Sequence, residues 1–174
     1  PPQPDGIYAF TQNRKPWPEA QGPDRFRRGL YTYFWRSSPH PMMPTFDAPD
    51  ANTTCTRRVR SNTPLQALTL ANDRTFIELA QALAVRILET SPDDDAARIR
   101  YGFLCTLGRE PTAAESERLL QYLDEQKSGF AANAKAALAL APESGAAEVP
   151  ARAGAAWTAV ARVLLNLDEF ITRE

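Results

Sequence analysis

The amino-acid sequence predicts a mainly α-helical protein: a small helical domain of four to five helices preceded by an extended arm rich in proline and aromatic residues. Residues 1–63 hold 10 of the 15 prolines and 9 of the 16 aromatic residues. Because proline fixes φ and removes a backbone donor, this density excludes long helices and central strands from the arm. Residues 64–174 instead repeat apolar residues at helical spacing between helix-capping residues.

The two regions also differ in charge. Residues 1–63 carry a net charge of +4 and form the arm, which we expect to pack on the helical part. Residues 64–174 carry a net charge of −5 and form the helical domain, with a linker of small residues at about 142–150. The aromatic side chains of the arm need a surface to be buried against, either the helices or another domain.

Capping residues predict the first two helices. The string from Thr63 to Gln66 is a capping box with proline at the first helical position, so we expect a short helix to about Ala71. The pair Asn72-Asp73 can cap the next helix. The apolar positions of that second helix are Phe76, Leu79, Ala80, Leu83 and Ile87.

A third helix is expected to start at Ser91-Pro92. Asp93, Asp94 and Asp95 would lie in its first turn, where the helix dipole favours negative charge. Gly108 is placed to end it. Its apolar stripe consists of Ala96, Ile99, Phe103 and Leu107.

Two further helices complete the prediction. Thr112 and Glu115 form a second capping box, and the helix that they begin continues to about Leu140 with a kink at Gly129. The last helix follows the linker and ends near Asn166. It presents one apolar face, made of Trp157, Val160, Ala161 and Leu164.

Composition excludes several functional classes. With 43% hydrophobic and 24% charged residues the chain is ordinary globular material, and its net charge of −1 argues against a nucleic-acid binder. No apolar run approaches the roughly 20 residues that span a bilayer, so we expect no direct membrane insertion. The sequence opens on Pro1-Pro2 without a signal peptide, and we interpret it as a piece of a longer protein.

The single histidine, His40, is a candidate functional residue because prolines on both sides hold it extended. Asp47, Asp50 and Cys55 follow it, so a site can be drawn from these residues. Their spacing matches no established metal pattern, and one imidazole makes a poor zinc or haem site. The simpler interpretation is that His40 bonds a backbone group and fixes its loop.

Asp47 and Asp50 form a second polar cluster with Arg57 and Arg58. Two carboxylates at a suitable separation could carry out acid–base chemistry. An ion-pair network that holds a turn before Thr63 is the simpler interpretation. The chain shows no nucleophile motif, phosphate loop or metalloprotease helix.

A basic and aromatic segment lies earlier in the arm. Arg25, Arg27 and Arg28 precede a run of aromatic residues at 30–36, a pattern that could stack on bases or sugars. Both faces of a strand here would be partly apolar, so we favour a buried extended segment or a mixed helix that docks the arm.

The two cysteines, Cys55 and Cys105, leave two possibilities open. They are either separate thiols or one disulfide, because the sequence does not show the distance between their Cα atoms. The absence of a Cys-x-x-Cys-His motif indicates that this segment attaches no c-type haem itself. We further expect it to hold no cofactor or metal of its own.

Several unusual strings occur in order along the chain. They are Arg27-Arg28-Gly29-Leu30-Tyr31-Thr32, Pro39-His40-Pro41-Met42-Met43, Phe46-Asp47-Ala48-Pro49-Asp50, Ser61-Asn62-Thr63-Pro64-Leu65-Gln66-Ala67-Leu68 with Asn72-Asp73, Leu107-Gly108-Arg109-Glu110-Pro111-Thr112, and Leu164-Leu165-Asn166-Leu167-Asp168-Glu169-Phe170. Together these strings resemble the C-terminal part of the planctomycete-specific domain of unknown function, family 1553. The resemblance extends over nearly the whole chain. Within the fifth string, Arg109 is placed to pair with a carboxylate.

The resemblance implies a setting rather than a mechanism. Such domains lie near the C-terminus of large exported proteins, often after a cytochrome c domain, which implies an extracytoplasmic location, haem elsewhere in the parent chain and other domains of the same polypeptide as partners. It implies no catalytic residues.

Two functional hypotheses follow. The first is a non-catalytic interaction module whose arm docks onto preceding domains. The alternative is a ligand-binding or enzymatic site for a glycan built from His40, Asp47, Asp50, Arg57 and Arg58. A redox or metal role for Cys55 with His40 is a third possibility.

Overall fold

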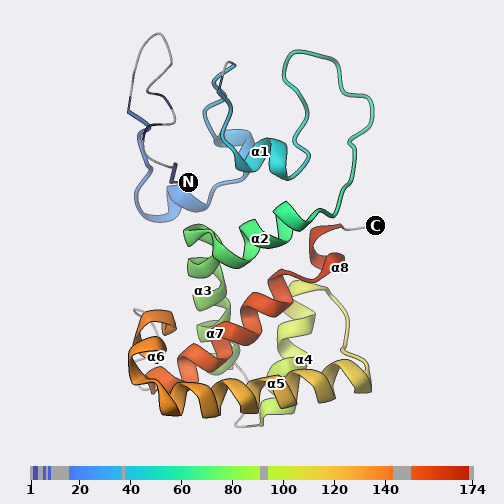
Figure 1. The fold of residues 1–174 in the computed structure, drawn as a ribbon. Helices are drawn as coiled ribbons and strands as arrows, with labels where there is room; N and C mark the ends of the chain where they lie inside the picture. Colours follow the sequence, from blue (N-terminus) through green and yellow to red (C-terminus); the bar gives the residue numbers. More distant parts are fainter. Residues whose placement is uncertain are drawn as a thin grey trace. The chain divides into compact units, whose positions relative to one another are not determined.

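The computed structural model describes residues 2, 3, 6, 8, 16–36, 38–90, 94–142 and 150–172. Within these residues the regular structure is helical and contains no strand, which confirms the predicted mainly α-helical class. None of the described helices has the length and apolar character that a membrane span requires. The chain divides into two compact units, Pro1–Gln66 and Ala67–Glu174, whose helices are labelled in Figure 1.

The first unit has little regular structure because of its prolines. It contains two 3₁₀ helices, Gly22–Phe26 and Gly29–Tyr31, and the short helix α1, Met42–Thr45. It also contains an aromatic cluster. The Tyr8 ring stacks on Trp17 with 5.8 Å between centroids and lies 5.4 Å from the ring of Trp35. Burial raises the pKa of Tyr8.

Helix α2, Pro64–Asn72, begins with the predicted capping box. The backbone N–H of Gln66 donates to Thr63 Oγ1 at 3.2 Å, and the N–H of Thr63 donates to Gln66 Oε1 at 2.8 Å. Helix α3, Arg74–Thr90, follows at once. Its predicted cap is confirmed, since Asp73 Oδ1 accepts from the N–H of Thr75 at 2.8 Å.

Helix α4, Asp95–Thr106, starts later than the sequence predicts. The side chain of Asp94 accepts from the N–H groups of Ala96 and Ala97, so Asp94 is the cap rather than a first-turn residue. The predicted start at residues 91–92 lies outside the described residues. The predicted end is confirmed, because Gly108 follows α4 with a φ of +73°, which favours glycine.

The predicted kink at Gly129 is wrong. Helix α5, Ala113–Ala132, runs through Gly129, and the chain leaves helical geometry at Asn133, where φ is −133° and ψ is 84°. Helix α6, Ala134–Leu140, begins there because Asn133 Oδ1 accepts from the N–H of Ala136 at 3.0 Å. Asn133 ends α5 because its side chain can cap a new helix, whereas Gly129 keeps its helical hydrogen bond and leaves the helix unbroken.

Helix α7, Ala151–Leu165, is the centre of the second unit and packs against α3, α4, α5 and α6. Eight consecutive residues, 154–161, are buried. Five of these eight are glycine or alanine, so neighbouring helices can approach α7 on every side. The short helix α8, Asp168–Ile171, follows and was not predicted.

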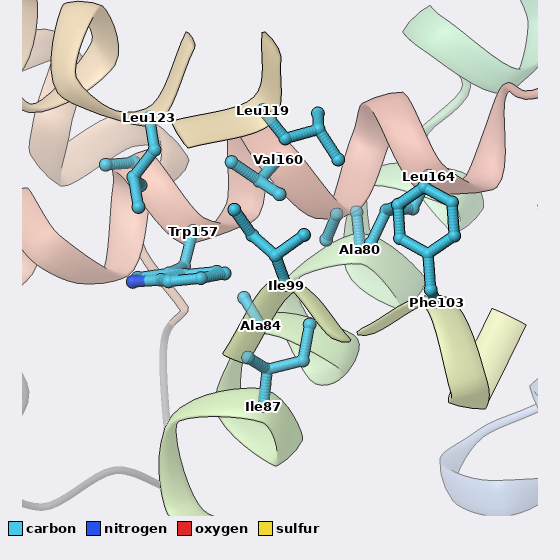
Figure 2. Close-up of a cluster of buried hydrophobic side chains, with 12 residues drawn as sticks. Ala80, Ala84, Ile87, Ile99, Phe103, Leu119, Leu123, Trp157, Val160 and Leu164 are labelled. Atoms are coloured by element: carbon cyan, nitrogen blue, oxygen red, sulfur yellow. The ribbon is translucent and has the colours of Figure 1, made fainter. Parts of the chain in front are cut away.

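The hydrophobic core forms around α7, as Figure 2 shows. Trp157, Val160 and Leu164 project from α7 between the side chains of the neighbouring helices. The residues that meet them are Ala80, Ala84 and Ile87 from α3, Ile99 and Phe103 from α4, and Leu119 and Leu123 from α5. The predicted apolar face of the last helix is therefore confirmed.

Candidate functional site

His40 is 3% exposed and is held by the backbone on both of its ring nitrogens. The backbone N–H of Met42 donates to Nδ1 at 3.3 Å, so Nδ1 carries no proton. Nε2 lies 3.1 Å from the carbonyl oxygen of Pro2 and is therefore the protonated nitrogen, which donates to it. The ring centroid lies 5.7 Å from that of Trp17. His40 thus makes the predicted backbone contacts and links the start of the chain to α1.

Asp47 ties two distant parts of the first unit together. Its carboxylate accepts from the backbone N–H of Ser61 at 2.8 Å and from Ser61 Oγ at 2.8 and 3.0 Å. Gln66, which is 1% exposed, donates from Nε2 to Ser61 Oγ at 3.0 Å and to the Thr45 carbonyl at 2.9 Å. Asp47 also has a φ of +55°, an uncommon backbone conformation for a residue with a side chain. We call this arrangement the Asp47 clasp.

The other predicted residues lie on the surface between the two ends of the clasp. Asp50 Oδ1 accepts from the backbone N–H of Asn52 at 2.9 Å and so forms a local turn. Arg58 Nη2 donates to the carbonyl oxygen of Asp47 at 3.3 Å. Arg57 is exposed. No ion pair joins these arginines to Asp47 or Asp50 in the described part of the chain, so the expected ion-pair network is wrong, and hydrogen bonds to Ser61 hold the turn instead.

His40 and Asp47, which lie on either side of α1, are held by different partners. His40 precedes α1 and contacts Pro2, Met42 and Trp17, whereas Asp47 follows α1 and contacts Ser61, Gln66 and Arg58. The two sets share no residue. Among the described residues no group of three or more His, Cys, Asp or Glu side chains is arranged to hold a metal ion. Cys55 and Cys105 are both free thiols.

The prediction that the aromatic run of the arm is buried is wrong for its first residues. Within the run at 30–36, Leu30 is 84% exposed and Tyr31 and Tyr33 are each 65% exposed, so this part of the run is not a buried segment. Phe26, which precedes the run, is 49% exposed. The 3₁₀ helix Gly29–Tyr31 presents two of these side chains and is closed by backbone bonds to Arg28 and Gly29. We call residues 26–33 the aromatic segment.

Arginine side chains contact two aromatic rings of this segment. The Arg27 guanidinium lies 5.6 Å from the centroid of the Tyr31 ring and donates to Asp24 at 2.7 Å. Arg25 lies 5.6 Å from the Phe26 ring and pairs with Glu19 at 3.1 Å. The rings are therefore positioned by their own neighbours while their outer surfaces stay exposed.

The predicted pairing of Arg109 is confirmed in the second unit. Its guanidinium donates to Glu115 at 2.8 and 3.0 Å, to Glu169 at 2.7 to 3.0 Å and to the Glu110 carbonyl at 3.0 Å. Arg109 and the N–H of Thr112 hold the pKa of Glu115 at about 2. Glu169 lies 60 residues away in sequence, so sequence spacing could not identify it as a partner.

A hollow of about 700 Å³ lies beside this network. The end of α4 and the start of α8 line it, with Cys105, Asp168 and Glu169 among the lining residues. None of the predicted site residues lies there. The thiol of Cys105 and the carboxylates of Asp168 and Glu169 line the hollow together, and Glu169 is bonded to Arg109.

Comparison with known proteins agrees with the family suggested by the sequence strings. The family described as "Protein of unknown function (DUF1553)" matches residues 2–123. This range includes the aromatic segment, His40, the Asp47 clasp and Arg109, whereas the string at 164–170 lies outside it. No curated protein and no solved structure shows a significant match to the chain. Since the match covers well over half of its residues, the chain belongs to this DUF1553 family of proteins of unknown function.

Proposed function

We propose that this chain is a non-catalytic interaction module that docks onto another protein domain through its aromatic segment. The observation that carries the proposal is the exposure of Leu30, Tyr31 and Tyr33 on a closed 3₁₀ turn. Large apolar side chains gathered on a surface indicate a binding site. Tyrosine, phenylalanine and arginine are the residue types enriched at protein interfaces.

The hydrogen bonds of His40 and Asp47, the main candidates for acid–base catalysis, also support this proposal. Both nitrogens of His40 contact backbone groups, and the Asp47 carboxylate is bonded to Ser61. A general acid or base needs a free atom within reach of a substrate. These residues instead position the backbone of the first unit, which is the role that a docking module requires of them.

The setting that we propose is a large exported protein with further domains, including cytochrome c domains, in the same polypeptide. In that setting the module has no haem of its own, and its partners are the neighbouring domains. The proposal places it outside the cytoplasm.

Calorimetric titration of this chain with the separately expressed remainder of its parent protein tests the function. We expect binding with a negative change in heat capacity, because apolar surface is buried. The double variant Tyr31→Ser/Tyr33→Ser should weaken binding by at least about tenfold, since exposed aromatic anchors dominate interface energetics.

Leu138→Ser is the matched control. Leu138 is 70% exposed but lies in α6 of the second unit, so its substitution should leave the affinity unchanged. Equal losses in the control and in the tyrosine double variant would contradict the proposal, as would the absence of binding by the unmodified chain.

A further inference from the structure

The Asp47 clasp holds the two ends of a long surface loop together. Residues 48–60 leave the clasp at Asp47 and return to it at Ser61, and every residue from 49 to 60 is exposed. A loop of this length with tied ends has the form of an Ω-loop, a class that often carries function. We call residues 48–60 the arginine loop.

The arginine loop displays positive charge that the described residues do not neutralise. Arg57, Arg58 and Arg60 are all exposed within four residues of sequence. Among the described residues none of them pairs with a carboxylate, and Arg58 donates only to a backbone carbonyl. The one carboxylate inside the loop, Asp50, is bonded to Asn52. Guanidinium groups in this state are suited to bind carboxylates of a partner in bidentate fashion.

The exposed side chain of Val59 indicates which class of molecule the arginine loop binds. It stands between Arg58 and Arg60 and is 73% exposed. A polyanion such as a nucleic acid or an acidic polysaccharide offers charge along its length but few apolar pockets for an aliphatic side chain. An acidic protein surface offers both carboxylates and apolar side chains.

We propose that Arg57–Arg60 form a recognition segment for an acidic protein surface with an apolar depression that accepts Val59. This inference rests on the proposed function only in taking the partner to be a protein. It adds a determinant separate from the aromatic segment: the arginines supply electrostatic attraction and orientation, and Val59 supplies an apolar contact.

A fluorescence anisotropy titration with a labelled synthetic peptide of alternating glutamate and leucine tests the proposal. Polyglutamate serves as a purely anionic second probe. We expect the chain to bind the peptide, and the double variant Arg57→Gln/Arg60→Gln to bind it about tenfold more weakly. Val59→Ser should weaken binding of the peptide severalfold and leave binding of polyglutamate unchanged.

Arg118→Gln/Arg152→Gln is the matched control, because it removes the same charge from exposed positions of the second unit. The proposal is overturned if the chain does not bind the peptide at low salt, if the control loses as much affinity as the loop variant, or if Val59→Ser has no effect. The peptide assay contains no parent domain and leaves Tyr31 and Tyr33 intact, so its failure and the failure of the proposed function are distinguishable.

Discussion

At the scale of single residues, Asp47 shows how one side chain organises a segment that has little regular structure. Its carboxylate bonds both the backbone and the hydroxyl of Ser61, and the buried Gln66 amide completes the arrangement. The same glutamine carries the reciprocal cap of α2. The Gln66 side chain therefore joins the end of the arginine loop to the start of α2 through hydrogen bonds.

Replacing Asp47 tests this arrangement. Asp47→Ala removes the acceptor of the Ser61 bonds and leaves an alanine at a φ of +55°, so we expect a loss of about 2–3 kcal/mol in the free energy of unfolding of the first unit. Urea titration followed by near-ultraviolet circular dichroism of Trp17 and Trp35 measures it. Asp50→Ala, whose carboxylate bonds only within its own exposed turn, should cost no more than about 0.5 kcal/mol. Equal costs would show that Asp47 holds no more than a local turn.

At the scale of helices, packing decides what a glycine does. A Cβ on Gly102 in α4 would lie 2.8 Å from Leu164 Cδ1 and 3.2 Å from Ile87 Cδ1, inside the fully buried core. A Cβ on Gly129 in α5 would meet nothing within 4 Å. Both glycines lie within helices, but only Gly102 faces other side chains at close range.

The same substitution should therefore have opposite effects at these positions. Gly102→Ala overpacks the core, and we expect it to destabilise the second unit by about 1–2 kcal/mol after the gain in helix propensity. Gly129→Ala gains propensity without a clash and should stabilise the second unit by about 0.5–1 kcal/mol. Urea unfolding followed by far-ultraviolet circular dichroism compares the two. A destabilising Gly129→Ala would indicate that α5 needs its glycine.

The cap of α5 makes the stability of the second unit sensitive to acid. The pKa of Glu115 is lowered from an ordinary 4.5 to about 2 by Arg109 and Thr112. A carboxyl with a lowered pKa in the folded state stabilises it above pH 4.5, and that contribution is lost as the pH falls toward 2. We expect Glu115→Gln, which can keep the capping bonds, to flatten the dependence of the free energy of unfolding on pH between 5 and 2.

Thermal unfolding across this pH range measures the effect, with Glu117→Gln as the control. Glu117 is an exposed residue of the same helix, and its substitution should leave the slope as it is in the unmodified chain. A Glu115→Gln variant with the unmodified slope would mean that the Arg109 network contributes nothing to acid stability.

At the scale of the whole molecule, the hydrophobic core belongs to one unit. In the described part of the chain, the twelve buried residues of this core run from Ala80 to Leu164, and none of them comes from the arm. We therefore expect a fragment of residues 63–174, which keeps the α2 cap, to fold by itself into a helical domain with a cooperative thermal transition. Trp157→Ala in this fragment should cost about 3–5 kcal/mol and abolish cooperativity, since the indole is 1% exposed at the centre of the core. A fragment with helical circular dichroism but no transition would contradict this expectation.

Local rules predicted most of the helical part from the sequence. The capping pairs Thr63–Gln66 and Thr112–Glu115 are separated by three residues, so their chemistry is readable directly, and both are formed. Gly108 ends α4 with a φ of +73°, which glycine adopts readily, so a single residue in the sequence is enough to predict this helix end. The apolar face of α7 follows from helical spacing, which identifies a buried face without identifying its neighbours.

Tertiary contacts settled the remaining features because they join residues far apart in sequence or depend on which surfaces are covered. Glu169 meets Arg109 across 60 residues, and Asp47 bonds Ser61 across 14. The exposure of Leu30 and Tyr31 has the same origin, since an apolar run indicates that a partner surface is needed but not whether the folded chain provides it. Composition and spacing thus predicted most of the helices and several of their caps, whereas the three-dimensional fold decided which charged groups pair and which aromatic side chains stay available to a partner.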